Sequence, residues 1–212
     1  ADQRALATAI DTGDHLGHGH NLTVPARSCG TLASMRVVAG ALGGRKLVCP
    51  EGEDTRPTSE RVREAMFNSL FSLDAIDGAR VLDLFAGSGA LGIEALSRSA
   101  KHATFIEQDR AALAALRENV ETLMIGSQCT VIAGDGLRHL ESVGEYDLIL
   151  LDPPYGFDGW DTLLSSIESG TVVIESDREV NPPFGWVVHR VKRYGGTVVT
   201  LATAGPRGEE EE

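Results

Sequence analysis

Arg80-Val-Leu-Asp-Leu-Phe-Ala-Gly-Ser-Gly-Ala-Leu-Gly92 indicates the fold, because an apolar run passes into glycines spaced as G-x-G-x-x-G. The run 80–85 predicts a buried strand, and the pattern from Leu91 to Arg98 predicts a helix after the glycines. Glycines in such a turn let the backbone approach a ligand closely. This stretch therefore predicts a strand, a ligand-binding turn and a helix.

The same alternation continues along the chain. The expected strands are Arg80–Phe85, Ala103–Glu107, Thr130–Ala133, Asp147–Leu151 and Thr171–Glu175. The expected helices are Leu91–Arg98, Arg110–Leu123, Leu137–Val143 and Trp160–Ile167. This order indicates βαβ units, and hence a parallel sheet with helices packed on it.

Both ends of this region differ from its middle. Tyr194-Gly-Gly196 separates the strand candidates Trp186–Lys192 and Thr197–Leu201, which predicts an antiparallel hairpin at the sheet edge. Upstream, Gly40-Ala-Leu-Gly-Gly44 predicts the turn of a small hairpin. Thr55-Arg-Pro57 then opens a helix whose apolar face is expected to contain Val62, Ala65, Met66, Leu70 and Leu73.

The expected fold class is therefore α/β, with a mostly parallel seven-stranded sheet, an antiparallel C-terminal hairpin, and a small N-terminal β-hairpin and helix. Residues 1–34 have no sustained period, and we expect a mobile leader, a segment foreign to the native protein or an overlong start assignment. Residues 35–76 form the N-terminal extension, 77–202 the sheet domain and 203–212 an acidic tail.

Acidic residues accompany four of the expected strand ends. Asp83 lies in the first strand, and Glu107, Asp135 and Asp152 end the second, third and fourth. Ligands of open α/β sheets bind outside the carboxyl ends of the strands, so we expect these carboxylates to line one crevice. Four acids suit a cationic ligand better than a phosphate-bearing one. S-adenosylmethionine fits, with its sulfonium and ammonium groups, a ribose for Glu107 and an adenine amine for Asp135.

Asp152-Pro-Pro-Tyr155 adds a second kind of chemistry. The Asp152 carboxylate and the Pro153 carbonyl are acceptors, Pro153 and Pro154 fix φ and cannot donate, and Tyr155 offers a face for stacking. Together they suit a planar heterocycle that carries an exocyclic amine. The acceptors would localise the amine lone pair, and Asp152 or water would take up the released proton.

Each residue also has a simpler interpretation. Asp83 could cap a strand end, Asp135 could form a turn and Asp152 could cap a helix. The glycines with Glu107, taken alone, fit a dinucleotide oxidoreductase equally well. Acids at four successive strand ends favour the joint interpretation.

Composition limits the class of protein. A chain of 212 residues with 42% hydrophobic content can bury one good core, and no apolar run approaches the ~18 residues of a membrane-spanning helix. Cys29, Cys49 and Cys129 are too widely spaced for a disulfide framework or a zinc site, which favours a reducing cytosol. The cluster His15-Leu-Gly-His-Gly-His20 lacks a Cys or carboxylate at matching spacing, so no metal is expected.

The net charge of −12 argues against a wholly basic nucleic-acid-binding protein, but two strips are basic and free of acids. One strip contains Arg36, Arg45 and Lys46, and the other contains Arg190, Lys192 and Arg193. A local positive field can bind phosphates on an acidic protein. The plainer alternative is that both strips are solvated strand faces.

Together these motifs resemble the class I S-adenosylmethionine-dependent methyltransferases that methylate amines, and specifically the ribosomal small-subunit RNA methyltransferase D family. The resemblance runs from about Met35 to Leu201. It is carried by Arg36-Val-Val-Ala-Gly-Ala-Leu-Gly-Gly-Arg-Lys-Leu47, Thr55-Arg-Pro-Thr-Ser-Glu-Arg-Val-Arg-Glu64, the stretch from Asp83 to Arg98, and Asp152 to Tyr155. The residues before Met35 and the acidic tail depart from the family pattern without touching a motif.

The resemblance implies methylation of N2 of one guanine in 16S ribosomal RNA, within an assembled or assembling small subunit. It implies target-base contacts by Asp152, Pro153, Pro154 and Tyr155. The implied cofactor contacts are Asp83, Phe85, Gly87, Gly89, Glu107, Gln108, Asp135 and Gly136, with Thr58 and Arg61 over the cofactor. A cytoplasmic monomer without membrane attachment is expected.

Three alternatives remain open. A DNA or RNA enzyme acting on adenine N6 or cytosine N4 could use the same clamp, although we expect a chain of this length to be too short for the sequence-reading domain of a site-specific DNA enzyme. A non-catalytic RNA-binding assembly factor could keep the fold. A nicotinamide oxidoreductase would bind NAD in place of S-adenosylmethionine.

Overall fold

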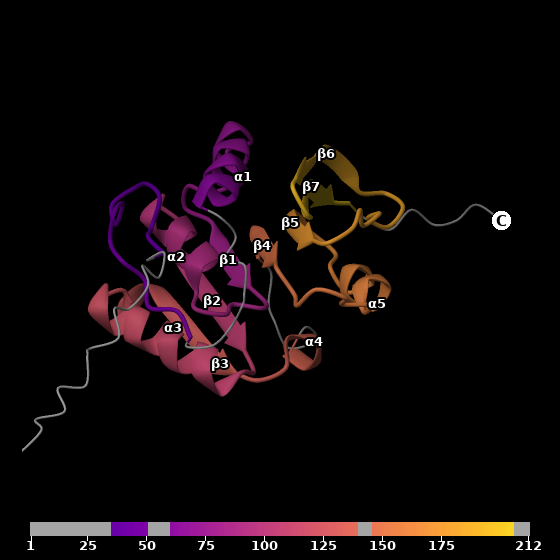
Figure 1. Cartoon of the computed structure of the whole chain (residues 1–212). Coiled ribbons are helices and arrows are strands. Elements are labelled where there is room, and N and C mark those ends of the chain that lie inside the picture. Colours follow the sequence, from indigo (N-terminus) through magenta and orange to yellow (C-terminus); the bar gives the residue numbers. More distant parts are fainter. Residues whose placement is uncertain (1–34, 51–59, 140–145, 206–212) are drawn as a thin grey trace, which may run out of the picture. The chain divides into compact units, whose positions relative to one another are not determined.

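The computed structural model describes residues 35–50, 60–139 and 146–205, which all belong to one compact unit, Ala33–Glu212 (Figure 1). The expected leader with its histidine cluster, the helix-opening Thr55-Arg-Pro57 and the acidic end of the tail lie outside the described residues.

Seven strands form one sheet in the order β3-β2-β1-β4-β5-β7-β6. Their bounds are β1 Arg80–Asp83, β2 His102–Glu107, β3 Cys129–Ala133, β4 Leu148–Leu151, β5 Gly170–Ser176, β6 Val187–Tyr194 and β7 Thr197–Ala204. The first five are parallel, whereas β7 runs antiparallel to β5 and β6 antiparallel to β7. The expected mixed sheet is therefore confirmed.

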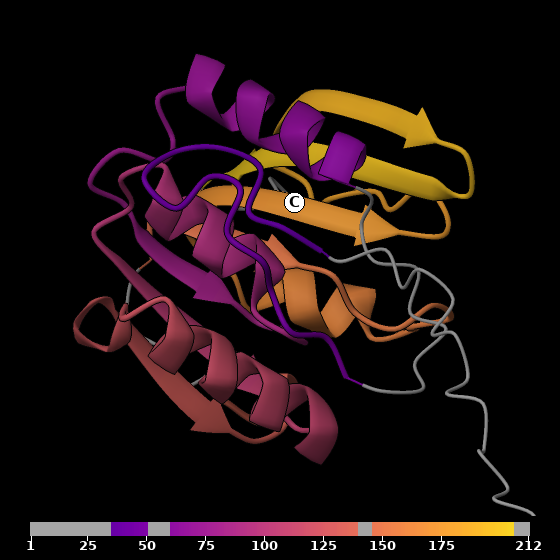
Figure 2. The same ribbon diagram turned by 60° about the vertical axis from the view of Figure 1, so that its left-hand side comes forward.

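Helices cover both faces of this sheet. They are α1 Glu60–Ser72, α2 Ala90–Ser97, α3 Arg110–Thr122, α4 Gly136–His139 and α5 Trp160–Ser165, with the short 3-10 helix η1 Gly126–Gln128. Figure 2 shows α1, α2 and α3 on one face and α5 on the other. The helix expected at Leu137–Val143 is described only as far as His139.

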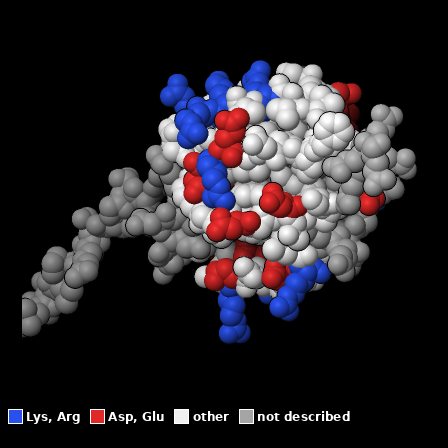
Figure 3. Space-filling model, turned by 90° about the vertical axis from the view of Figure 1, so that its right-hand side faces the viewer, with Lys and Arg blue, Asp and Glu red and all other residues white. Residues whose placement is uncertain are grey.

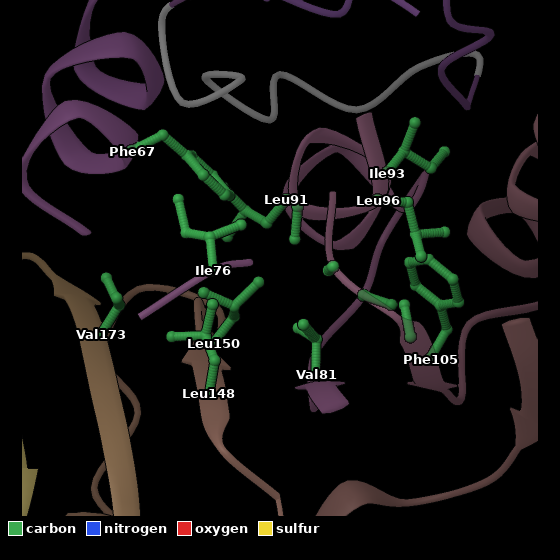
Figure 4. Close-up of a cluster of buried hydrophobic side chains, with 14 of the residues drawn as sticks. Phe67, Ile76, Val81, Leu91, Ile93, Leu96, Phe105, Leu148, Leu150 and Val173 are labelled. Carbon is green, nitrogen blue, oxygen red and sulfur yellow. The ribbon is translucent and has the colours of Figure 1, made fainter. Parts of the chain in front are cut away.

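Two buried apolar clusters, one on each face, hold the layers together. Strand residues point alternately to opposite faces, so Val81 joins the α1–α3 side and its neighbour Leu82 joins the α5 side. On the first side, Phe67 of α1 and Leu91 of α2 lie over Leu150 of β4 (Figure 4). The strands between the layers are apolar on both faces because both faces are covered.

Residues 35–48 double back on themselves and pack on α2. Arg36 and Lys46 form an isolated antiparallel bridge, which gives the expected hairpin a much shorter ladder than a pair of full strands. Buried Glu94 of α2 accepts hydrogen bonds from Val38 N at 2.7 Å and Ala39 N at 3.1 Å. Because Glu94 is fully buried and charged, these donors also contribute to its solvation.

The same carboxylate pairs with two arginines. Arg98 Nε lies 2.8 Å from Glu94 Oε1, and buried Arg63 Nε lies 3.6 Å from Glu94 Oε2. Arg63 also donates to the carbonyl of Arg36. These contacts fix the N-terminal segment to both α1 and α2.

The apolar face expected for α1 is correct for Val62, Met66 and Leu70, which are buried. It is wrong for Leu73, which lies beyond the last residue of the helix and is 40% exposed.

Among the described residues, no helix is long and apolar enough to cross a membrane.

Candidate active site at the carboxyl edge of the sheet

The loops that leave β1, β2, β3 and β4 meet at one edge of the sheet. Leu84 N, just after β1, donates to Leu150 O of β4 at 3.1 Å, and Ala86 N donates to Ile106 O of β2 at 3.1 Å. Gly134 N, just after β3, donates to Glu107 O at 2.9 Å. The exits of these four strands are therefore adjacent, as the parallel order requires.

Asp83 is the most deeply buried acid of this edge, with 1% of its surface exposed. Its Oδ2 accepts from Gly92 N at 2.9 Å, whereas its buried Oδ1 has no hydrogen-bond partner among the described residues. Burial raises the pKa of Asp83 to about 7; the Gly92 bond opposes this rise and the nearby Glu107 charge adds to it. An unsatisfied buried carboxylate oxygen favours a cationic or hydrogen-bond-donating ligand.

The turn between β1 and α2 is formed by the predicted glycines. Gly87 and Gly89 have φ of 55° and 84°, in the left-handed region that glycine adopts most readily. A side chain at Gly87 would meet no atom within 4 Å, so open space adjoins the turn there. A side chain at Gly89 would meet Leu116 Cδ1 at 2.4 Å, so that glycine lets the turn pack against α3.

Glu107, at the end of β2, holds this turn in place. Its Oε2 accepts from Gly87 N at 2.7 Å, and its Oε1 accepts from Asp109 N at 2.7 Å. Each carboxylate oxygen has two acceptor sites, so both oxygens can still accept from the hydroxyls of a ribose. Asp109 itself caps α3 by accepting from Ala111 N and Ala112 N.

Asp135 follows β3 and is half-buried. Its Oδ1 accepts from Leu137 N at 3.0 Å, and its Oδ2 lies 3.8 Å from Arg138 Nε. Asp135 thus has the turn-forming contact considered above as the simpler interpretation. Next to it, a side chain at Gly136 would meet Leu84 O at 2.9 Å, so only glycine fits this close approach to the end of β1.

Four other residues were expected to contact the cofactor: Phe85, Gln108, Arg61 and Thr58. Phe85, directly after Leu84, is half-buried and makes an edge-to-face contact with Phe157, with ring centroids 5.5 Å apart. Gln108 is exposed beside Glu107, and Arg61 is exposed on α1. Thr58 lies outside the described residues.

The expected base clamp leaves β4 at the same edge. Asp152 is half-buried, Pro153 is buried and Pro154 is exposed. Tyr155 is 53% exposed, and its hydroxyl lies 3.1 Å from Thr197 Oγ1 at the start of β7. A half-exposed ring that is anchored through its hydroxyl can present a face for stacking.

The two basic strips lie in different places. The end of β6 is near the clamp, because Tyr194 pairs with Thr197, which contacts Tyr155. All three basic residues of the second strip are exposed on β6: Arg190, Lys192 and Arg193. Figure 3 shows Lys and Arg side chains gathered at the upper left of the face that it views, with Asp and Glu side chains directly below them.

Arg45 of the first strip is remote from this edge. Arg45 Nη2 donates to Thr122 O, at the last residue of α3. Because α3 begins at the carboxyl edge and has 13 residues, its last turn lies about 20 Å from that edge. Arg36 and Lys46 are exposed in the same N-terminal segment. Both strips contact α1, because Arg63 donates to the carbonyl of Arg36 and Arg190 donates to Ser69 Oγ.

Some residues at this edge were not predicted from the sequence to belong to the site. Asp177 and Arg178 follow β5 and contact the clamp loop at Gly156 and Phe157. Their position directly after a strand is the same signal that identified Asp152. The Thr197 contact with Tyr155 joins residues 42 positions apart and has no local signature.

The strand order and the glycine turn after β1 define the class I methyltransferase fold. The chain belongs to the ribosomal small-subunit RNA methyltransferase D family, and the family described as "Conserved hypothetical protein 95" matches residues 35–203. The resemblance seen in the sequence is thereby confirmed.

Relatives from several bacteria support this membership. "Putative rRNA methyltransferase YlbH" of Bacillus subtilis (strain 168) is 39% identical over 79% of this chain and 97% of its own. "Ribosomal RNA small subunit methyltransferase D" of Escherichia coli (strain K12) is 35% identical over 84% and 93%. The solved structure "Putative methyltransferase yhhF from Escherichia coli" is 34% identical and has a TM-score of 0.73, covering 82% of this chain and 99% of that one.

Proposed function

We propose that this protein transfers a methyl group from S-adenosylmethionine to the exocyclic N2 amine of one guanine in 16S ribosomal RNA. One observation carries the proposal: the buried acid Asp83 and the Asp152–Tyr155 clamp leave neighbouring strands, β1 and β4, at the same edge. A site for a cationic cofactor thus adjoins a site for a planar base with an amine.

The residues of the first site fit the cofactor. Asp83 has an unsatisfied buried oxygen among the described residues, and open space adjoins Gly87. Asp83, Glu107 and Asp135 place negative charge where the ammonium, sulfonium and ribose groups would bind, and NAD, with its pyrophosphate, would be repelled there. S-adenosylmethionine supplies an activated methyl group, so the protein needs no covalent intermediate.

The residues of the second site would prepare the amine. The guanine amine is a weak nucleophile because its lone pair is delocalised into the ring. Asp152 and the Pro153 carbonyl would accept from its two N–H groups and localise the lone pair. Tyr155 would stack on the base and offset part of the cost of removing it from its helix, about a few kcal/mol.

Guanine N2 is proposed over adenine N6 and cytosine N4 because of the family. The clamp alone suits any exocyclic amine, and the choice of guanine N2 rests on the family resemblance of the sequence motifs. Two relatives that match most of this chain are named for ribosomal RNA, one of them for the small subunit, which supports the class of nucleic acid. We extend their substrate class to this protein, with the assembled or assembling small subunit as partner, in the cytoplasm and as a monomer.

The rest of the chain is assigned on the same basis. Residues 77–202 would form the catalytic domain together with Thr203 and Ala204, which end β7, so the expected boundary of the tail moves to residue 205. Residues 35–76 would form an extension of it, with 1–34 and 205–212 outside the catalytic unit. Both basic strips would bind RNA phosphates. The β6 strip would act closest to the target base, because β6 ends beside Thr197 and the clamp.

Asp152→Ala tests the clamp. We expect methyl transfer to purified small subunits to fall by about 100-fold or more, because positioning and hydrogen bonding of the amine are lost together. Affinity for S-adenosylmethionine, measured by calorimetry, should stay within about twofold. Parallel samples of naked ribosomal RNA and DNA identify the substrate class. A near-normal rate for Asp152→Ala, or faster transfer to DNA, would contradict the proposal.

A further inference from the structure

The residues that follow β5 hold the loop that contains the clamp. Arg178 Nη2 donates to Phe157 O at 2.8 Å and to Asp158 Oδ1 at 2.9 Å, and its Nη1 donates to Asp177 Oδ1 at 3.3 Å. Asp177 Oδ2 accepts from Gly156 N at 3.2 Å. We call these two side chains, Asp177 and Arg178, the bracket.

The loop itself has few means of fixing its own shape. Pro153 and Pro154 have no N–H group to donate. Phe157 N donates to Pro154 O at 3.2 Å, which closes a tight turn with Tyr155 and Gly156 in its middle. Gly156 has φ of 80°, which glycine adopts without strain and which suits the third position of a type II turn. Tyr155 therefore lies at the tip of a turn that is held mainly from outside.

The bracket binds the two residues that directly follow Tyr155. Its two hydrogen bonds flank the peptide bond between Gly156 and Phe157. Asp177 accepts from the N–H of Gly156, and Arg178 donates to the carbonyl of Phe157. The Phe157 ring packs edge-to-face on Trp160, with centroids 5.1 Å apart. With the Thr197 bond to the Tyr155 hydroxyl, these contacts determine where the Tyr155 ring points.

We infer that Asp177 and Arg178 are positioning residues for methyl transfer, which hold the turn so that Tyr155 and Asp152 meet the target base in one geometry. This inference rests on the proposed function. Neither residue needs to touch the base or the cofactor, because both act through the backbone of Gly156 and Phe157.

The exposed fractions of the bracket side chains allow a positioning role to be distinguished from a purely structural role. The side chains of Asp177 and Arg178 are 36% and 45% exposed, and that of Asp158 is 90% exposed. Ion pairs at such positions contribute little to folding stability. Removing the bracket should therefore change turnover much more than the melting temperature.

The test compares Asp177→Ala and Arg178→Ala with Glu179→Ala, which removes an exposed acid at the next position. Turnover is measured on small subunits, cofactor affinity by calorimetry and folding by thermal melting. We expect kcat to fall by about 10- to 100-fold in both bracket variants, because small displacements of reacting groups are costly. Cofactor affinity and melting temperature should stay at wild-type values, and Glu179→Ala should be normal in all three.

Two further variants test whether the bracket acts as a unit. Arg178→Lys keeps the charge, but its single nitrogen cannot reproduce the planar fork with which Nη1 and Nη2 reach separate acceptors, so it should recover only part of kcat. The double variant should be no slower than Arg178→Ala alone, because each residue needs the other. Wild-type kcat in the two single alanine variants would overturn the inference and leave the proposed function intact.

Amide hydrogen exchange tests the bracket independently of methyl transfer, so a failure of the inference can be told apart from a failure of the proposed function. Faster exchange of the Gly156 amide in Asp177→Ala, with Glu179→Ala unchanged, supports the bracket even if the wild-type protein methylates no RNA. Unchanged exchange in both bracket variants would overturn it.

Discussion

Asp83 lies in surroundings that oppose its negative charge. Burial raises its pKa to about 7, the Gly92 hydrogen bond opposes this rise, and the Glu107 charge adds to it. A carboxyl group whose pKa is higher in the folded state stabilises that state at low pH, where it is protonated in both states. This stabilisation is lost as the pH rises from about 4 to above 7.

We therefore expect the ligand-free protein to lose stability across this pH window, and Asp83→Asn to lose less. Urea unfolding at several pH values measures both slopes. Bound S-adenosylmethionine, as a cation, should favour ionised Asp83, so wild-type affinity should rise with pH more steeply than that of Asp83→Asn. Equal slopes for the two proteins in both experiments would show that Asp83 does not ionise in this range.

Gly92 determines how closely α2 approaches β2. A side chain here would meet Phe105 Cε1 at 2.3 Å and Asp83 Oδ2 at 3.2 Å, so Gly92→Ala must move the helix or the ring. We expect a loss of about 1–3 kcal/mol in the free energy of unfolding, as for other overpacked cores.

Gly126→Ala is the matched control for this substitution. Its new side chain would meet only Val120 Cγ1, at 4.0 Å, and it lies in η1 away from α2. Chemical denaturation of both variants gives the comparison. Equal stabilities would mean that the contact between α2 and β2 adapts without cost.

Most elements could be predicted because their patterns are local. Apolar runs ended by a turn identified all seven strands to within three residues, as in β2, expected at Ala103 and beginning at His102, and in β7, expected to end at Leu201 and ending at Ala204. Leu73 was misassigned because helical period alone does not determine where a helix ends. Asp152 could be predicted as a site residue for the same reason, because it directly follows the apolar run that forms β4.

Contacts between distant segments could not be predicted in this way. Glu94 pairs with Arg63 and with the backbone of Val38, and each partner is more than 30 residues away. Inside the expected helix, Glu94 would have been assigned to a solvated face, yet it is fully buried. The different distances of Arg45 and of the end of β6 from the clamp could not be predicted either, because the two strips look alike in the sequence.

This difference in distance from the clamp predicts unequal effects on RNA. Lys192→Glu with Arg193→Glu changes charge at the end of β6, beside the clamp, whereas Arg45→Glu with Lys46→Glu makes the same change near the end of α3. We expect both pairs to weaken RNA binding and its dependence on salt. The β6 pair should also lower kcat/KM more strongly, because it acts next to the target base.

Filter binding across a range of salt concentrations, with Arg117→Glu as an exposed control on α3, measures the first effect. Steady-state kinetics on small subunits measure the second. Salt slopes equal to that of the control would show that both strips are merely solvated faces.

At the scale of the whole molecule, the proposed function combines a site for a cationic methyl donor with a clamp for a nucleobase amine, at one edge of one sheet. Mass spectrometry of nucleosides from small subunits that were treated with the protein and isotopically labelled S-adenosylmethionine tests this combination. The predicted result is label in N2-methylguanosine at a single position, and its loss with Asp152→Ala. Label in N6-methyladenosine or N4-methylcytidine, or no labelled nucleoside with the wild-type protein, would contradict it.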